Sequence, residues 1–166
     1  MFSDETTIEI HPYNAMNRVR RFSFENPFQK KYISPKQKYP LKVMFWGGVS
    51  CEGKTDLIPI DGLMNSERYI NEILEKHVLP INRANKEIVF QQDNAACHTA
   101  HKVNEYFRNN QINKISWPSH SPDLNIIENV WGKMKLILNK EIIRSRKELF
   151  IMQRKYGMKI YLKNLY

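Results

Sequence analysis

An aspartate follows a short apolar segment in the stretch QQDNAACHTA, residues 91–100. The apolar residues are EIVF, 87–90, and after two glutamines Asp93 stands beside Asn94, with His98 further along. A carboxylate at the end of a buried strand suits a metal ligand, because functional groups in α/β sheets collect at the carboxyl ends of strands. The stretch also suits a polar loop, since DNAA favours an Asx turn. Which reading holds depends on the other acids that fold beside Asp93.

Two other regions supply acids that could join Asp93. Asp4 and Glu5 stand in the first predicted strand, where alternation directs their side chains to opposite faces, so only one can reach the site. Glu128 stands at the start of a predicted helix, off its apolar stripe. Each acid also has a structural explanation: Asp4 and Glu5 as surface groups of an edge strand, and Glu128 as the N3 position of a capping box begun by Asn125.

Three carboxylates in one place repel one another unless a cation lies between them. Mg²⁺ prefers oxygen ligands and keeps several waters. Two such ions, roughly 3.5–4 Å apart, can stabilise both the attacking and the leaving oxygen of a phosphodiester displacement. If Asp4, Asp93 and Glu128 meet, metal-dependent phosphodiester chemistry is therefore the reaction class they favour.

The bulk composition fits one globular domain with a real core, because 42% of the 166 residues are hydrophobic and 11% are aromatic. The longest apolar run, 43–51, is too short for a membrane span, and no basic-then-apolar leader opens the chain. Cys51 and Cys97 indicate free thiols in a reducing compartment. Zinc at Cys97, His98 and His120 is not expected, since no ligand pair has the usual spacing.

The positive charge gathers in two stretches of a chain whose net charge is +9. Residues 17–42 carry eight Lys or Arg and one acid, and residues 133–163 carry ten against two acids. This distribution favours a polyanionic partner, nucleic acid before membrane, because no basic amphipathic anchor helix is evident. A merely solubilising surface explains the charge equally well.

The periodicity predicts strands first, then alternating helices and strands. Strands are expected at 1–12, 17–24, 43–50, 54–60, 87–92 and 114–117, with 43–60 forming a hairpin and 87–92 buried on both faces. Helices are expected after a cap at Asn65 or Ser66, after a cap at Thr99, and over a final stripe of Ile127, Val130, Trp131, Met134 and Ile137. The first strand is expected at the centre, beside the strand that precedes Asp93. The result is a mixed sheet with helices on its faces.

Four blocks, FSDET, VMFWGGVSCEGK, QQDNAACHTA and WPSHSPDLNIIENVW, resemble in order those of the mariner-type superfamily of DDE transposases. The closest similarity is to the branch whose third acid is glutamate and in which 34 residues separate the last two acids; residues 94–127 separate Asp93 from Glu128 here. The resemblance covers about residues 1–140 and is weaker beyond, although YLKNLY resembles a segment near the family's C-terminus.

The resemblance implies an α/β ribonuclease H-like fold (retroviral integrase superfamily) with Asp4, Asp93 and Glu128 as catalytic acids and metal ligands. They would hold two Mg²⁺ (or Mn²⁺) ions, cut double-stranded DNA at transposon ends and join the freed 3′-hydroxyl to a TA target site. A nuclear location and a homodimer follow from the same resemblance, with no membrane partner. Asn94 and His98 match characteristic family positions and are expected to shape the site or contact DNA, with helix capping as the alternative for His98.

In the two basic stretches, the candidate DNA contacts are Arg18, Arg20, Arg21, Lys133 and Lys135. We expect residues 1–140 to form the catalytic domain and residues 141–166 to form a basic helical extension of it. The family's N-terminal helix-turn-helix region is expected to be absent, because the chain begins three residues before the first acid.

Ala96 and Ile126 depart from the family, which usually has proline at both positions, so both turns are less rigid here. Neither change removes an acid. Two alternatives to an active transposase domain remain at this stage: a catalytically inactive, truncated remnant that binds DNA non-specifically, and a different nuclease or resolvase of the same fold.

Overall fold

A computed structural model describes residues 1–10, 24, 41–141 and 143–156. The candidate DNA contacts Arg18, Arg20 and Arg21 lie outside the described residues, as does all of the predicted strand 17–24 except Phe24. The chain divides into two compact units, Met1–Thr7 with Met44–Trp131 and Ile8–Val43 with Gly132–Tyr166. The three candidate acids all belong to the first unit. None of the described helices is long and apolar enough to cross a membrane.

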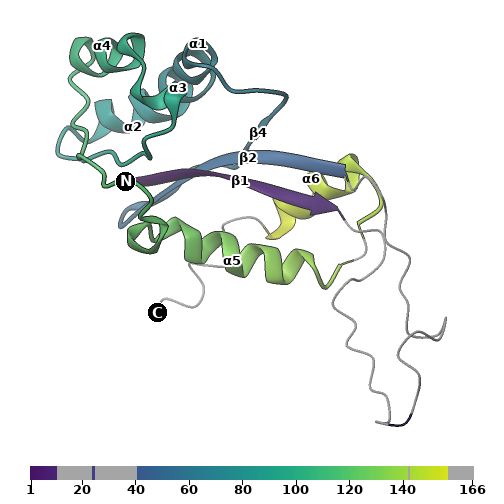
Figure 1. The fold of residues 1–166 in the computed structure, drawn as a ribbon. Helices are drawn as coiled ribbons and strands as arrows, with labels where there is room; N and C mark the ends of the chain where they lie inside the picture. The colour runs from purple at the N-terminus through teal and green to yellow at the C-terminus, as the bar shows by residue number, and fades with distance from the viewer. Residues whose placement is uncertain (11–23, 25–40, 142, 157–166) are drawn as a thin grey trace. The chain divides into compact units, whose positions relative to one another are not determined.

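The antiparallel part of the sheet is built around β2 (Leu41–Ser50), which pairs with β1 (Phe2–Ile10), β3 (Gly53–Lys54) and β4 (Ile58–Ile60) (Figure 1). The predicted hairpin is confirmed, but its second strand is split. Three residues separate Lys54 from Ile58, whereas only two separate their partners Val49 and Trp46, so the second strand carries one extra residue. Such an insertion interrupts a ladder as a β-bulge does.

Among the described residues, the parallel part of the sheet consists of two single bridges, Phe2 with Gln91 and Phe90 with Lys114. The strands predicted at 87–92 and 114–117 are therefore reduced to these contacts. Burial on both faces is also limited to Phe90–Gln92, because Val89 is 47% exposed. Backbone hydrogen bonds join Met1 to Val89 and Gln91, and Ser3 to Gln91, so this pairing covers only the last part of the segment 87–92. The predicted mixed sheet is nevertheless confirmed.

One continuous helical segment runs from Ser66 to Ala84. It comprises α1 (Ser66–Arg68), the π-helix η2 (Tyr69–Val78) and α2 (Leu79–Ala84). Asn65 is the cap, since its Oδ1 accepts a 2.9 Å hydrogen bond from the Arg68 N–H and satisfies a donor of the first turn. The sequence predicted either Asn65 or Ser66 as the cap, and the structure shows that the cap is Asn65.

The helix predicted after Thr99 begins differently. The residues form a short helix, α3 (Ala96–Thr99), followed by α4 (His101–Asn109), whose N-cap is Ala100. The prediction that Thr99 caps this helix is therefore wrong. Its hydroxyl donates instead to the Ala95 carbonyl at 3.2 Å, a local bond that competes with capping.

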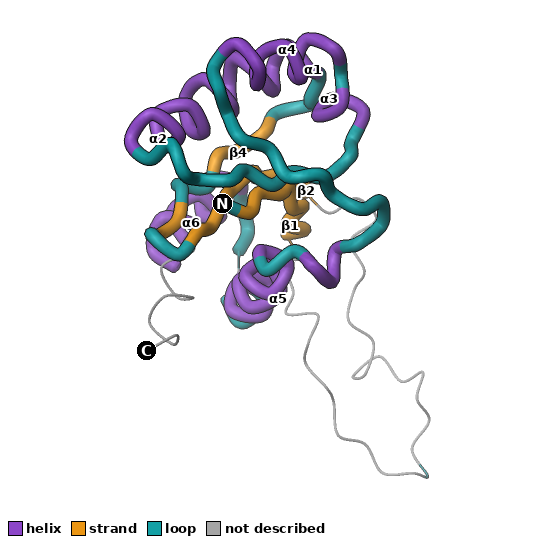
Figure 2. Tube along the Cα trace, turned by 90° about the vertical axis from the view of Figure 1, so that its left-hand side faces the viewer, coloured by secondary structure: helices purple, strands orange, loops and turns teal. Residues whose placement is uncertain are grey.

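The remaining helices are the 3₁₀ turn η3 (Pro122–Leu124), α5 (Ile127–Leu138) and α6 (Arg146–Tyr156). In α5 the predicted stripe is buried at Ile127, Val130, Trp131 and Met134, but its last member is Leu138, because Ile137 remains partly exposed. Between α2 and α5, the segments that do not belong to α3 or α4 are mainly loops (Figure 2). The candidate site depends on these loops.

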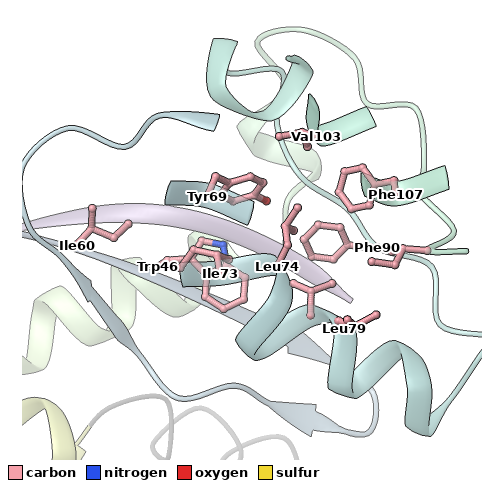
Figure 3. Packing of buried hydrophobic residues seen from close by; sticks show 11 residues of the cluster. Trp46, Ile60, Tyr69, Ile73, Leu74, Leu79, Phe90, Val103 and Phe107 are labelled. Atoms are coloured by element: carbon pink, nitrogen blue, oxygen red, sulfur yellow. The ribbon is translucent and has the colours of Figure 1, made fainter. Parts of the chain in front are cut away.

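The core of the first unit joins the strands to the helices that pack against them (Figure 3). Trp46 of β2 and Ile60 of β4 pack with Tyr69 and Ile73 of η2 and with Phe107 of α4, and all are at most 4% exposed. Burying large apolar side chains of this kind contributes about 1.5–3 kcal/mol each. This packing holds η2 and α4 against the sheet that carries the acids.

Candidate active site

Asp4 and Asp93 stand at matched positions because β1 runs parallel to the segment before Asp93. Phe2 bridges Gln91. The N–H and hydroxyl of Ser3 donate to the Gln91 carbonyl at 3.2 and 2.8 Å. Each aspartate lies two residues beyond the bridged pair, and side chains two residues apart share a face of the sheet. The predicted pairing of the first strand with the strand of Asp93 is therefore confirmed.

Asn125 brings the start of α5 to β1 and so delivers Glu128. This buried side chain donates from Nδ2 to the Ser3 carbonyl and accepts from the Ile127 N–H at Oδ1, both at 3.3 Å. The Asn125 N–H donates to the Pro122 carbonyl at 3.0 Å, so it is not used by Glu128 as a reciprocal capping box would require. Of the two reciprocal hydrogen bonds that a capping box would need, the one from the Asn125 N–H to the Glu128 carboxylate is therefore missing. The Glu128 side chain is exposed.

Asp4, Asp93 and Glu128 line one pocket of about 380 Å³ within the first unit. The segment Trp117–Pro122 forms much of the remaining wall, together with Asn94 and its neighbour Ala95. Among the residues that the structure describes, no three His, Cys, Asp or Glu side chains are close enough together to hold one ion. The three acids thus share a pocket without forming a closed coordination shell.

The surroundings of Asp4 disfavour the ionised form of its carboxyl group. Burial raises its pKa to about 7, and the neighbouring carboxylates of Glu5 and Glu128 act in the same direction. A 3.1 Å hydrogen bond from the Trp131 indole N–H to Oδ2 opposes this shift. A partly buried carboxylate beside other carboxylates is stabilised by a cation, so the electrostatics and the oxygen donors fit a hard divalent ion.

Asp93 is held in the opposite state, as a carboxylate. Its hydrogen bond with His98, whose Nδ1 lies 2.5 Å from Oδ1, holds the pKa of Asp93 below its usual range. The Ala95 N–H donates to the same oxygen at 2.9 Å, which closes the predicted Asx turn. Both bonds end on Oδ1. In the described part of the chain, Oδ2 has no hydrogen-bond partner.

His98 is a buried residue, only 2% exposed, and its second nitrogen lies 3.3 Å from Oε1 of Glu5. Burial by itself would lower the pKa of His98, but the hydrogen bond with Asp93 and the adjacent carboxylate of Glu5 raise that pKa to about 10. The ring is therefore charged at neutral pH. Because it is buried, His98 does not offer a surface for DNA, and the geometry favours the site-shaping alternative.

The other sequence candidates are placed as follows. Asn94 is exposed, lines the pocket and donates to the Trp117 carbonyl at 2.8 Å. Lys133 and Lys135 are partly exposed residues of α5 in the second unit. Cys51 and Cys97 are free, as predicted.

Three residues of the site were missed by sequence reasoning. Glu5 approaches His98, Trp131 donates to Asp4, and Asn125 ties α5 to β1. Glu5 had a partial signal, since alternation predicted that it faces away from Asp4. Trp131 was expected only in the apolar stripe. The sequence could not predict that its indole N–H bonds to Asp4. A buried tryptophan usually finds a hydrogen-bond acceptor, but the sequence does not say which one.

Comparisons with known proteins show which family the chain belongs to. The family of DDE superfamily endonucleases matches residues 1–150. The Tcb1 transposase of Caenorhabditis briggsae is 34% identical over 140 residues, which cover 81% of this chain and 50% of that protein. The Tc1 transposase of Caenorhabditis elegans is 32% identical over 143 residues, with the same coverage. The chain spans about half the length of these curated relatives.

Solved structures agree on the fold. The Mos1 transposase paired-end complex with left transposon end has a TM-score of 0.73 at 19% identity, covering 95% of this chain and 47% of that chain. The catalytic domain of Mos1 mariner transposase has a TM-score of 0.58 at 18% identity, covering 95% and 68%. At this identity the likeness establishes the fold, and the predicted ribonuclease H-like class is confirmed. The chain belongs to the DDE superfamily endonucleases, and its relatives there are Tc1/mariner transposases.

Proposed function

We propose that this chain is the catalytic domain of a transposase that cuts DNA at transposon ends and joins the freed 3′-hydroxyl to a TA target site. The observation that carries the proposal is the convergence of Asp4, Asp93 and Glu128 on one pocket. They come from β1, from the loop after Gln92 and from α5, elements that are distant in sequence. Family membership supports the same reaction class.

Asp4, Asp93 and Glu128 would together hold two Mg²⁺ or Mn²⁺ ions. Bound ions would offset the repulsion among the acids and stabilise charge on the oxygens of the phosphodiester. Two solved Mos1 catalytic-domain structures carry Mn and Mg in their names, which supports use of a divalent metal. The oxygen-only donor set is also the one such ions prefer.

The protein's own contribution is to hold these oxygens. His98 and the Ala95 N–H fix one oxygen of Asp93, and the Trp131 indole fixes one oxygen of Asp4. The Asn94 side chain donates to the Trp117 carbonyl and so joins two segments that line the pocket. Positioning of this kind supplies most of the catalysis in phosphoryl-transfer sites, because the residues themselves form no covalent bond to the substrate.

Double-stranded DNA is the proposed partner. The name of the similar Mos1 complex includes a left transposon end, and the name also describes a paired-end complex. We extend both features to this chain, so two copies would act together on transposon ends in the nucleus. The basic residues Arg18, Arg20, Arg21, Lys133 and Lys135 would contact phosphates, which gives affinity with little sequence choice.

The test is a plasmid-nicking assay in Mn²⁺ with wild type, Asp93→Asn and Glu128→Gln. Asp123→Asn is the matched control, because Asp123 is an exposed acid near the pocket that does not line it. Both site variants should lose more than about 100-fold in rate, since even outer-shell changes at metal sites typically cost 10–100-fold. The control should keep its rate.

If wild type nicks no faster than Asp93→Asn, the catalytic proposal fails and an inactive DNA-binding remnant is the remaining reading. Salt-dependent DNA binding that survives loss of all three acids would then support that reading. If wild type cuts but never joins strands into TA sites, the chain is a nuclease of this fold and not a transposase.

A further inference from the structure

His98 lies between two acids, Glu5 of β1 and Asp93 of the loop after Gln92. Its Nδ1 is 2.5 Å from Oδ1 of Asp93, and its Nε2 is 3.3 Å from Oε1 of Glu5. The second contact has an ion-pair distance but not hydrogen-bond alignment, so the Asp93 side is the stronger one. Each ring nitrogen therefore faces a carboxylate oxygen, and the ring forms a link from β1 to the loop that carries Asp93.

The ring itself has little freedom to turn. Its centroid lies 4.2 Å from that of Tyr69, a fully buried residue of η2, and the His98 side chain is buried. The Tyr69 hydroxyl donates to Oε1 of Gln92 at 2.8 Å, and Nε2 of Gln92 donates to the His98 carbonyl at 2.9 Å. These buried bonds join Gln92 and His98, the residues on either side of the turn that begins with Asp93.

Asp93 needs such support because its own side chain is about half exposed, with 49% of its surface accessible. An exposed side chain samples several rotamers, and fixing one of them costs conformational entropy at the moment a ligand binds. Metal-binding carboxylates are commonly hydrogen-bonded by outer residues that fix their orientation. His98 is placed to do this here, and Glu5 is placed to fix His98.

Glu5 has no other role in the described site. It does not line the pocket, although it directly follows Asp4, which does. Successive side chains of a strand point to opposite faces, so Asp4 faces the pocket and the next residue, Glu5, faces His98. The Glu5 side chain is only 18% exposed, and a carboxylate that is largely withdrawn from water is costly unless it is paired; the imidazole ring is the group that faces it.

We propose that Glu5 and His98 are positioning residues for Asp93: the ring holds Oδ1, Glu5 holds the ring, and Oδ2 stays available to a divalent cation. The catalytic consequence rests on the proposed function, but the positioning itself does not. The alternative is that His98 is an ordinary buried histidine that stabilises the fold. In that case the Asp93 side chain would adopt the same rotamers without it.

The experiment compares His98→Ala, His98→Asn and Glu5→Gln with wild type, and uses Glu9→Gln as the matched control. Glu9 is a carboxylate of the same strand that belongs to the second unit and pairs there with Lys42. The first readout is the χ1 rotamer of Asp93 in the metal-free protein, from NMR three-bond couplings. Wild type and Glu9→Gln should show one rotamer, and His98→Ala should show averaging.

The second readout is Mn²⁺ affinity by calorimetry. His98→Ala should bind roughly 10–100-fold more weakly, the range for loss of an outer-shell partner, and Glu5→Gln should lose less. His98→Asn should retain more affinity than His98→Ala, because its amide can donate to Asp93. Glu5→Gln should add little in a His98→Ala background, since the two residues act in series.

The proposal is overturned if His98→Ala and Glu5→Gln fold, keep a single Asp93 rotamer and bind Mn²⁺ within about twofold of wild type. If His98→Ala does not fold, Glu5→Gln and His98→Asn carry the same comparison. Failure of the proposed function is a separate result: wild type would then bind no Mn²⁺ at all, while the rotamer measurement would still decide whether His98 positions Asp93.

Discussion

The indole N–H of Trp131 donates a 3.1 Å hydrogen bond to Oδ2 of Asp4, joining the last helix of the site to its first strand. Trp131 is 1% exposed, so it is a core residue of α5 and a polar partner of the site together. Glu128, three residues earlier on the same helix, lines the pocket with Asp4. The packing of α5 therefore fixes two of the three acids.

Replacing Trp131 by Phe should keep most of the packing and remove this bond. We expect a loss of about 1 kcal/mol in the free energy of unfolding, the usual value for one hydrogen bond. Mn²⁺ affinity should fall as well, because the pKa of Asp4 rises further without its donor. Urea unfolding and calorimetry measure the two effects. Trp46→Phe, in the core away from the acids, should lower stability only; equal metal affinity in both variants would contradict the role of the indole.

The pKa of Asp4, raised by burial to about 7, predicts a specific pH dependence. The folded state favours the protonated carboxyl, so the stabilising contribution is complete below the ordinary value near 4 and is lost as pH rises through 7. Wild type without metal should therefore lose stability relative to Asp4→Asn between about pH 4 and pH 7, with no further loss above that range. Thermal melts across this range measure the difference. Parallel stability curves for the two proteins would refute it.

Mn²⁺ binding should depend on pH in the opposite direction. The cation requires the ionised form of Asp4, so affinity should rise between pH 6 and 8 and binding should release protons. Calorimetry in two buffers of different ionisation enthalpy measures the released protons. Asp4→Asn should bind more weakly and lose the part of this dependence that comes from Asp4. An affinity that is flat with pH in wild type would count against Asp4 as a ligand.

Asn125→Ala should destabilise the protein and impair the site together. It removes the bonds to the Ser3 carbonyl and the Ile127 N–H in a buried position, which costs about 1–3 kcal/mol for the partners left unsatisfied. The start of α5 should then shift, so plasmid nicking should fall by more than stability alone explains. Asn129→Ala, an exposed position of the same helix, is the control and should change neither quantity.

Lys133 and Lys135 should contribute to DNA affinity through phosphates only. Replacing both with Ala should weaken binding equally for DNA with and without TA sites, and should reduce the slope of log K against log salt by about 1 per lysine. Fluorescence anisotropy at several salt concentrations measures this slope. Lys86→Ala, an exposed lysine outside the basic stretches, serves as control. An unchanged slope in the double variant would remove these lysines from the DNA surface.

The sequence was sufficient where the signal is local or depends on element order. The apolar periods predicted β1, the hairpin of β2 with β3 and β4, and the burial of Ile127, Val130 and Trp131 in α5. Element order placed the first strand beside the segment before Asp93, and the parallel bridge of Phe2 with Gln91 confirms that pairing. Thr99 was misassigned as a cap, because the sequence cannot tell whether a hydroxyl bonds forwards or backwards along its helix.

The amino-acid sequence by itself predicted the three candidate acids and their order, and it determined the family to which the chain belongs. Only the tertiary structure decided the partners of the two aspartates: Trp131 for Asp4, and His98, which also lies beside Glu5, for Asp93. These contacts depend on strand register and side-chain rotamers that are fixed only when distant elements pack. A periodic pattern reports which face of an element is buried, but it carries no information on which polar atom across the interface will be the partner.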